Sequence, residues 1–230
     1  MLQQGEYPQA RQACTDALPS PGRERCLRIA SLMLDPRDVE SFQTAATEAD
    51  SAYALTVLGE AATARENFTS AEHYYRDAIA RNPDIAQAYF GLGEIHQKQN
   101  QPDAALDGYQ QAVERAPQNR RFLLNLASVY AERGQLPEAE IHYRQVLALD
   151  DSVLLAYIEL GQVLEQRQKF AEARELAQQA MQGLEQHPDW KDKPLNAQEW
   201  FILQDGQPFY LSSWEDKTAY LQAWLERVGD

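Results

Sequence analysis

Histidines and cysteines are the residues of this chain that could most readily bind a metal or act in catalysis, and both types are rare. The chain has four histidines, which stand apart at His73, His96, His142 and His187. None belongs to an HExxH or other ligand pattern, and no P-loop, GxSxG or GxGxxG motif is present. Carboxylates are too common for any pair of them to indicate an acid and a base. We therefore expect no metal, no cofactor and no enzymatic activity.

The two cysteines allow two interpretations. Cys14 and Cys26 lie on either side of the turn Pro19-Ser20-Pro21-Gly22 and would be level in an antiparallel helix pair. A disulfide there would contribute about 3 kcal/mol and would indicate a periplasmic or other extracytoplasmic location. Two small buried thiols at a helix interface would instead fit the cytoplasm. No CxxC or Cys/His cluster indicates zinc.

The charge balance narrows the class of partner. The chain has 35 acidic and 21 basic residues, and its formal net charge is -14. This charge repels phosphate backbones and anionic membranes, so we expect no nucleic-acid partner. A polypeptide with a basic or polar surface is the more natural complement, although an acidic balance also keeps many proteins soluble.

Neither a membrane helix nor a signal sequence is evident. No stretch approaches the ~20 apolar residues that are needed to span a bilayer. The start, Met1-Leu2-Gln3-Gln4, lacks the basic and apolar regions of a secretory signal. Two alternatives stay open: the chain begins with a capping helix, or an upstream signal or anchor was removed.

A period of 34 residues runs through the middle of the chain. Two columns share it: Leu58-Gly59, Leu92-Gly93, Leu126-Ala127 and Leu160-Gly161, and Ala71, Ala105, Ala139 and Ala173. Two further columns are in phase: Tyr75, Tyr109, Tyr143 and Ala177, and Ala78, Ala112, Val146 and Ala180. Such a period is the signature of a repeat architecture.

These columns resemble the tetratricopeptide repeat family. The second unit fits best, because it reads Tyr89-x2-Leu92-Gly93-x2-His96, then Ala105-x3-Tyr109, then Pro117. The resemblance implies an all-α, right-handed α-α superhelix that acts as a non-enzymatic scaffold for another protein. It covers four units, at 52–85, 86–119, 120–153 and 154–187.

The residue pattern of each unit predicts a helix, a turn and a second helix. Large apolar residues at spacings of three and four form one helical stripe, a polar break follows, and a second stripe begins. Small residues such as Gly93 and Ala105 allow the two helices to approach closely. One unit cannot bury both of its faces, so the four units are expected to stack and to form a concave side.

Both ends of the chain depart from the period. Residues 1–51 predict a partial repeat and a diverged hairpin. Residues 188–230 contain all four tryptophans, and Asp205-Gly206 lies between two apolar runs, which predicts a short β-hairpin. A capping box at Ser212 and Glu215 predicts a final amphipathic helix. This Trp-rich segment covers the last repeat or docks onto a partner.

The resemblance also implies which residues bind a partner, because the first helix of each repeat lines the groove in this family. Those positions are Tyr53, Thr56, Glu60, Phe90, Glu94, Lys98, Arg121, Asn125, Glu159 and Gln162. Amides can pair with an extended peptide backbone, and carboxylates favour Lys or Arg. The alternative function is assembly, in which the Trp-rich segment mediates self-association or holds the chain in a larger complex.

Overall fold

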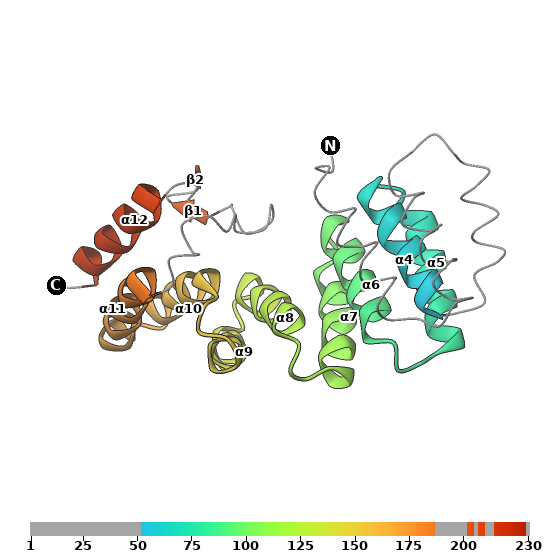
Figure 1. Cartoon of the computed structure of the whole chain (residues 1–230), viewed down its shortest axis with the longest axis horizontal. Coiled ribbons are helices and arrows are strands. Elements are labelled where there is room, and N and C mark those ends of the chain that lie inside the picture. The colour runs from blue at the N-terminus through green and yellow to red at the C-terminus, as the bar shows by residue number, and fades with distance from the viewer. Residues whose placement is uncertain (1–51, 187–201, 205–206, 210–213, 229–230) are drawn as a thin grey trace. The chain divides into compact units, whose positions relative to one another are not determined.

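The computed structural model describes residues 52–186, 202–204, 207–209 and 214–228, and this part of the chain is almost entirely helical (Figure 1). Its helices up to residue 186 are α4 (Ala52–Ala64), α5 (Phe68–Arg81), α6 (Ala86–Lys98), α7 (Pro102–Arg115), α8 (Arg120–Glu132), α9 (Leu136–Leu149), α10 (Leu154–Gln166) and α11 (Phe170–Gln186). Helix α12 (Trp214–Arg227) follows two short strands, β1 (Ile202–Gln204) and β2 (Gln207–Phe209).

The helices follow the period of the sequence. The first helices of the four hairpins begin at Ala52, Ala86, Arg120 and Leu154, and the second helices at Phe68, Pro102, Leu136 and Phe170. Both sets of starts are 34 residues apart. The sequence-derived repeat therefore corresponds to one helical hairpin.

Capping side chains and a proline explain where three of the helices begin. Asn67 caps α5 by accepting a hydrogen bond from the Ser70 backbone N–H, and Asn119 caps α8 by accepting from those of Arg121 and Phe122. Pro102 is the first residue of α7, where its missing N–H costs nothing.

The turn inside each hairpin uses one left-handed residue. Positive φ angles occur at Glu66, Asn100, Gly134 and Gln168, again 34 residues apart. Glycine adopts this conformation freely and asparagine tolerates it, whereas glutamate and glutamine do so rarely. The reversal is therefore set by the hairpin packing and not by the turn residue alone.

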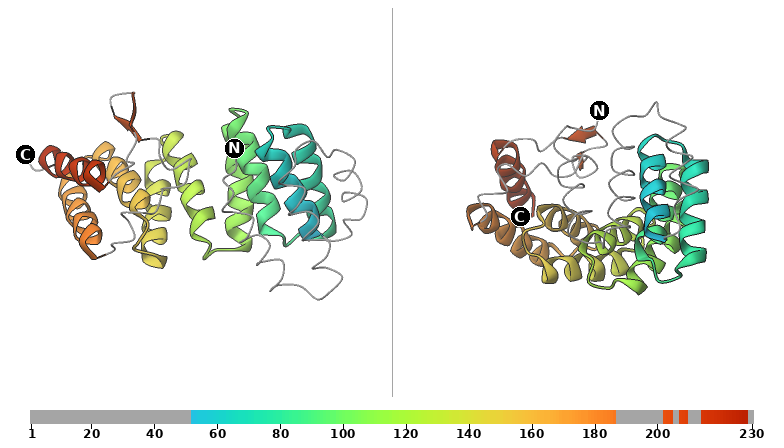
Figure 2. Two further views of the ribbon diagram at one scale, coloured as in Figure 1. Left: turned by 45° about the horizontal axis from the view of Figure 1, so that its top comes forward. Right: turned by 45° about the vertical axis from the view of Figure 1, so that its right-hand side comes forward.

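The chain divides into two compact units, residues 1–116 and 117–230, which we call the N-terminal and C-terminal units. In the described part of the N-terminal unit, α4 to α7 lie side by side in Figures 1 and 2. Its core contains Leu55, Leu58, Tyr75 and Ile95, each at most 2% exposed.

Tyrosines of the second helices pack against glycines of the first helices. A Cβ built on Gly59 would lie 2.5 Å from the Tyr75 ring, and a Cβ on Gly93 would lie 2.6 Å from the Tyr109 ring. Gly91 also lies against Tyr75, so that ring is held between α4 and α6. The small residues of the repeat are needed because the rings occupy the space of a side chain.

The C-terminal unit has a core of its own, which α8 to α12 share. It combines Tyr143 of α9, Leu160 and Leu164 of α10, Leu184 of α11 and Trp224 of α12, each at most 1% exposed. Both views of Figure 2 show α12 beside the α10–α11 hairpin. Helix α12 is therefore packed onto the last repeat of the described chain.

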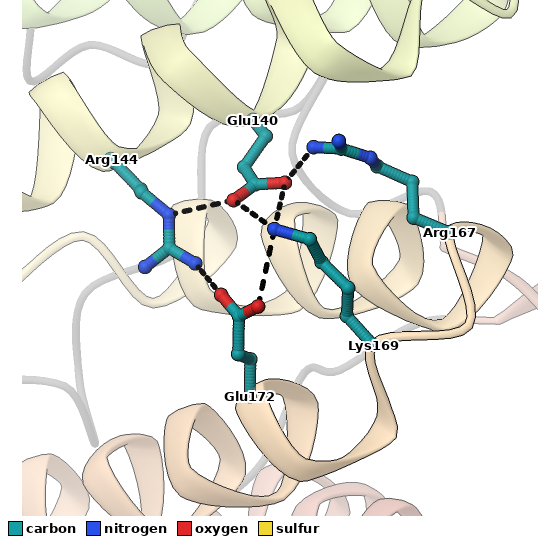
Figure 3. A network of polar contacts seen from close by, with 5 residues as sticks. All are labelled: Glu140, Arg144, Arg167, Lys169 and Glu172. Carbon is teal, nitrogen blue, oxygen red and sulfur yellow. Dashed lines mark hydrogen bonds and ion pairs between the residues drawn. The ribbon is translucent and has the colours of Figure 1, made fainter.

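An ion-pair network joins the third hairpin to the fourth (Figure 3). Glu140 of α9 is 7% exposed and accepts hydrogen bonds from Arg144 Nε (3.1 Å) and Lys169 Nζ (3.1 and 3.2 Å), and from Arg167. Glu172 bonds to Arg144 at 2.5 Å and to Lys169 at 3.1 Å. Burial acts to raise the pKa of Glu140, but the bonds from Lys169 and Arg144 outweigh it and the net pKa is lowered. The three cations compensate the charge of the Glu140 carboxylate, which links the third hairpin to the fourth.

Strands β1 and β2 pair antiparallel over three residues each, with Ile202 opposite Phe209 and Gln204 opposite Gln207. Apart from this short pair, the described part of the chain is helical. That the two strands cover the last repeat stays a prediction. The partial repeat in residues 1–51, the cysteines and residues 188–201 lie outside the described residues. The superhelical twist also stays a prediction.

Candidate partner-binding faces

The first helices of the N-terminal unit, α4 and α6, carry six of the residues that were predicted to contact a partner. The structure buries two of them: Thr56 is 2% exposed and donates to the Ala52 carbonyl oxygen at 2.9 Å, and Phe90 is 0% exposed against the Tyr109 ring, with centroids 5.2 Å apart. Thr56 and Phe90 are therefore core residues.

The other predicted residues of this unit remain accessible. Tyr53 is 54% exposed, Lys98 is exposed, and Glu60 and Glu94 are half-buried. Glu60 accepts a hydrogen bond of 2.7 Å from Gln87 Nε2, which joins α4 to α6. Gln87 was not predicted as a contact, although it occupies the same repeat position as Tyr53. We call Tyr53, Glu60, Gln87, Glu94 and Lys98 together the α4–α6 face.

In the C-terminal unit the first helices are α8 and α10, and they hold the other four predicted residues. Arg121 is exposed, and Asn125, half-buried, donates from its amide to the Arg121 carbonyl oxygen at 2.9 Å. Glu159 and Gln162 of α10 are half-buried. Gln162 lies close enough to Tyr220 of α12 to act on the pKa of its hydroxyl. Arg121 and Asn125 thus form one local pair, whereas Gln162 is engaged by α12.

Glu159 belongs to a polar cluster that sequence reasoning missed. It accepts a hydrogen bond of 3.2 Å from the Tyr143 hydroxyl, and Glu132 lies near enough to act on its charge. Burial, with a further contribution from Glu132, raises the pKa of the Glu159 carboxyl, and the bond from Tyr143 only partly opposes this. Burial and the Glu159 charge raise the pKa of Tyr143 well above its usual value. The charged form of Glu159 is therefore poorly stabilised.

The raised pKa of Glu159 predicts a pH dependence of stability. A carboxyl group whose pKa is higher in the folded than in the unfolded state favours folding at low pH, and this contribution is lost as the pH rises through the folded-state pKa. Glu159→Gln removes the titrating group, so the stability of the variant relative to wild type should increase as the pH rises from about 4.3, the ordinary glutamate pKa, through the raised folded-state pKa. Denaturant midpoints of both proteins across this range provide the measurement. A difference that does not change with pH would contradict the prediction.

The histidines of the described chain make separate, local contacts. His73 lies 3.6 Å from Asp77, His96 bonds to Gln101 at 2.8 Å, and His142 stacks on Tyr130. The described residues contain no group of histidine, cysteine and acidic side chains that could hold a metal ion. His187 and both cysteines fall outside these residues. Among the described helices, none has the length and apolarity to cross a membrane.

The described chain is built from repeated two-helix hairpins, and in the first three a tyrosine of the second helix is buried in the core. This arrangement defines a helical-repeat protein. Models of the tetratricopeptide repeat match residues 56–107, 95–153 and 153–187. The chain belongs to the tetratricopeptide repeat family, and its repeats span more than half of its length. No curated protein sequence gives a significant match.

Solved structures of tetratricopeptide proteins have the same fold. YrrB, described as a TPR protein with an unusual peptide-binding site, is 21% identical, with a TM-score of 0.59 over 79% of this chain and 93% of YrrB. A crystal structure of MamA is 18% identical, with a TM-score of 0.56 over 82% of this chain and 99% of that protein. MamA from Desulfovibrio magneticus RS-1, from residue 41 to its end, is 18% identical, with a TM-score of 0.58 over 79% of this chain and 94% of that one.

Proposed function

We propose that the chain is a non-enzymatic scaffold that binds a partner polypeptide along the first helices of its repeats. The family is one of protein-interaction scaffolds, and the structurally similar YrrB is described as having a peptide-binding site. The accessible residues proposed as contacts are Tyr53, Glu60, Gln87, Glu94, Lys98, Arg121, Asn125, Glu159 and Glu132, which occupies the repeat position of Lys98 on α8.

The observation that carries the proposal is the poorly compensated carboxylate of Glu159 on α10. It accepts a hydrogen bond from a neutral hydroxyl, that of Tyr143, and the charge that acts on it is the like charge of Glu132. Glu159 is half-buried, and a carboxylate in such a setting is stabilised by a nearby cation, as the buried Glu140 of the same unit is by three of them. A Lys or Arg side chain of a partner would provide that charge.

The α4–α6 face supports a partner with an accessible backbone. The Gln87 amide and the Glu60 carboxylate present both a donor and acceptors on the helices that also carry the exposed ring of Tyr53. Such groups can pair with the N–H and C=O groups of an extended segment while the ring covers an apolar side chain. The proposed partner is therefore a polypeptide with basic residues, in keeping with the net charge of -14.

Charge reversal on the first helices tests the proposal. Glu94→Lys on α6 and Glu132→Lys on α8 should each lower partner recovery about fivefold in affinity capture from the native organism, because a repulsive charge replaces an attractive one. The matched controls are Glu114→Lys on α7 and Glu175→Lys on α11, which make the same change on exposed second-helix positions. Quantitative mass spectrometry measures recovery. Equal partner recovery by all four variants would refute partner binding along the first helices.

A further inference from the structure

Helix α12 inserts an aromatic ring that the fourth repeat lacks. In the first three repeats the ring belongs to the second helix, at Tyr75, Tyr109 and Tyr143, but the fourth has Ala177. A Cβ on Gly161 would overlap the Trp224 ring of α12, just as a Cβ on the equivalent glycines of the first two repeats would overlap the tyrosine of their own repeat. Trp224 thus occupies the position of the missing tyrosine.

Polar side chains of α12 also reach α10, a first helix, while the backbone of α12 lies mainly against α11. Arg227 makes a two-point bond to Glu165, with both N–O distances 3.0 Å. Tyr220 is 7% exposed, and burial raises its pKa, while Gln162 and Arg227 act to lower it. Gln162 is one of the residues that the family resemblance assigns to partner binding. Helix α12 therefore covers part of the first-helix face of the fourth repeat.

The contact residues of α12 share one helical stripe. Tyr220, Trp224, Arg227 and Val228 stand at positions i, i+4, i+7 and i+8, which lie on the same side of a helix. An amphipathic helix that docks on a groove through such anchors is a recurring mode of peptide recognition. The fourth repeat thus already holds a ligand of this class, and that ligand is the chain's own α12.

The attachment of α12 is not optimal. The Trp224 indole N–H is buried and has no hydrogen-bond acceptor among the described residues. A buried donor without an acceptor loses its bond to water and gains none in return, which weakens the docked state. Helix α12 is not a continuation of α11, because residues 187–213 separate the two helices in the sequence.

We propose that α12 is a displaceable internal ligand, and that the face beneath it receives an amphipathic helix of a partner polypeptide with the same pattern of aromatic, aromatic and arginine. The face consists of Gly161, Gln162 and Glu165 of α10 and Ala177 of α11. The inference rests on the proposed scaffold function for the existence of a partner. The competition between α12 and a second helix does not depend on that partner and can be tested separately.

The test uses the full-length chain and a fluorescent peptide of residues 212–230. Arg227→Glu in the chain places a carboxylate beside Glu165 and should weaken the internal ligand, while Trp224 and the core stay intact. The labelled wild-type peptide should then bind the Arg227→Glu chain about tenfold more tightly than the wild-type chain, as measured by fluorescence anisotropy.

A charge swap assigns the binding face. A Glu165→Lys chain should prefer a peptide that carries Arg227→Glu over the wild-type peptide about fivefold, because opposite charges are restored. The Arg227→Glu chain should have the reverse preference. Equal binding to the wild-type and Arg227→Glu chains, no binding to either, or an unchanged preference after the swap would each overturn the inference. Affinity capture with the charge-reversed first-helix variants is a separate experiment. The scaffold proposal and the α12 proposal can therefore fail independently.

Discussion

Trp224→Ala is expected to lower the free energy of unfolding of the C-terminal unit by about 3 to 5 kcal/mol. The side chain is 1% exposed and lies against Gly161, in the same buried cluster as Ala177, so its removal leaves a cavity that rigid helices cannot close. Urea denaturation followed by circular dichroism measures the change. The control is Gln222→Ala, an exposed position on the same helix, which should have little effect.

A second substitution shows whether Trp224 replaces the repeat tyrosine. Ala177→Tyr restores the column of Tyr75, Tyr109 and Tyr143, so it should recover part of the stability in the Trp224→Ala chain. In the wild-type chain the same substitution should destabilise, because two rings would compete for one space. Strictly additive effects of the two substitutions would contradict this account.

Gly93→Leu should lower the free energy of unfolding of the N-terminal unit by about 1 to 3 kcal/mol. A Cβ at this position would lie 2.6 Å from the Tyr109 ring, and a Cβ on Gly108 of α7 would lie 2.7 Å from the Gly93 nitrogen. Helices α6 and α7 therefore meet backbone to backbone, and an added isobutyl group must separate them.

The control for Gly93→Leu is Lys98→Leu, which introduces the same residue at an exposed position of α6. Its effect should stay within about 0.5 kcal/mol. Thermal and urea unfolding of both variants provide the comparison. An unchanged melting temperature for Gly93→Leu would contradict the close helix approach.

The repeat period made most of the described fold predictable. Leu, Gly, Ala and Tyr recur every 34 residues because each hairpin solves the same packing problem, and the helix starts follow the same spacing. The missing tyrosine at Ala177 was also visible in the sequence. That a tryptophan far along the chain fills its place depends on tertiary contacts, which no local pattern specifies.

Features that depend on contacts between repeats were harder to predict. Phe90 and Thr56 occupy positions that the family pattern assigns to the groove, yet neighbouring side chains bury them. The three cations around Glu140 come from α9, from the end of α10 and from the turn before α11, so no motif contains them. The left-handed turn residues could be predicted only in part from their residue types, because Glu66 and Gln168 are not typical of that conformation.

The buried tryptophan also bears on the assembly alternative. Trp224 is engaged within its own chain, so in the docked state it cannot mediate association with another molecule. The side chains of the other tryptophans lie outside the described residues. Assembly through the Trp-rich segment would therefore require either those residues or release of α12.

Partner binding along the first helices is tested most directly by site-specific photo-crosslinking. A photoreactive amino acid replaces Glu94 of α6 or Glu132 of α8, with Glu114 of α7 and Glu175 of α11 as matched exposed positions on second helices. We predict that the two first-helix positions form adducts with the same partner polypeptide and that the two second-helix positions do not. Adducts formed only from positions 114 and 175 would contradict the account.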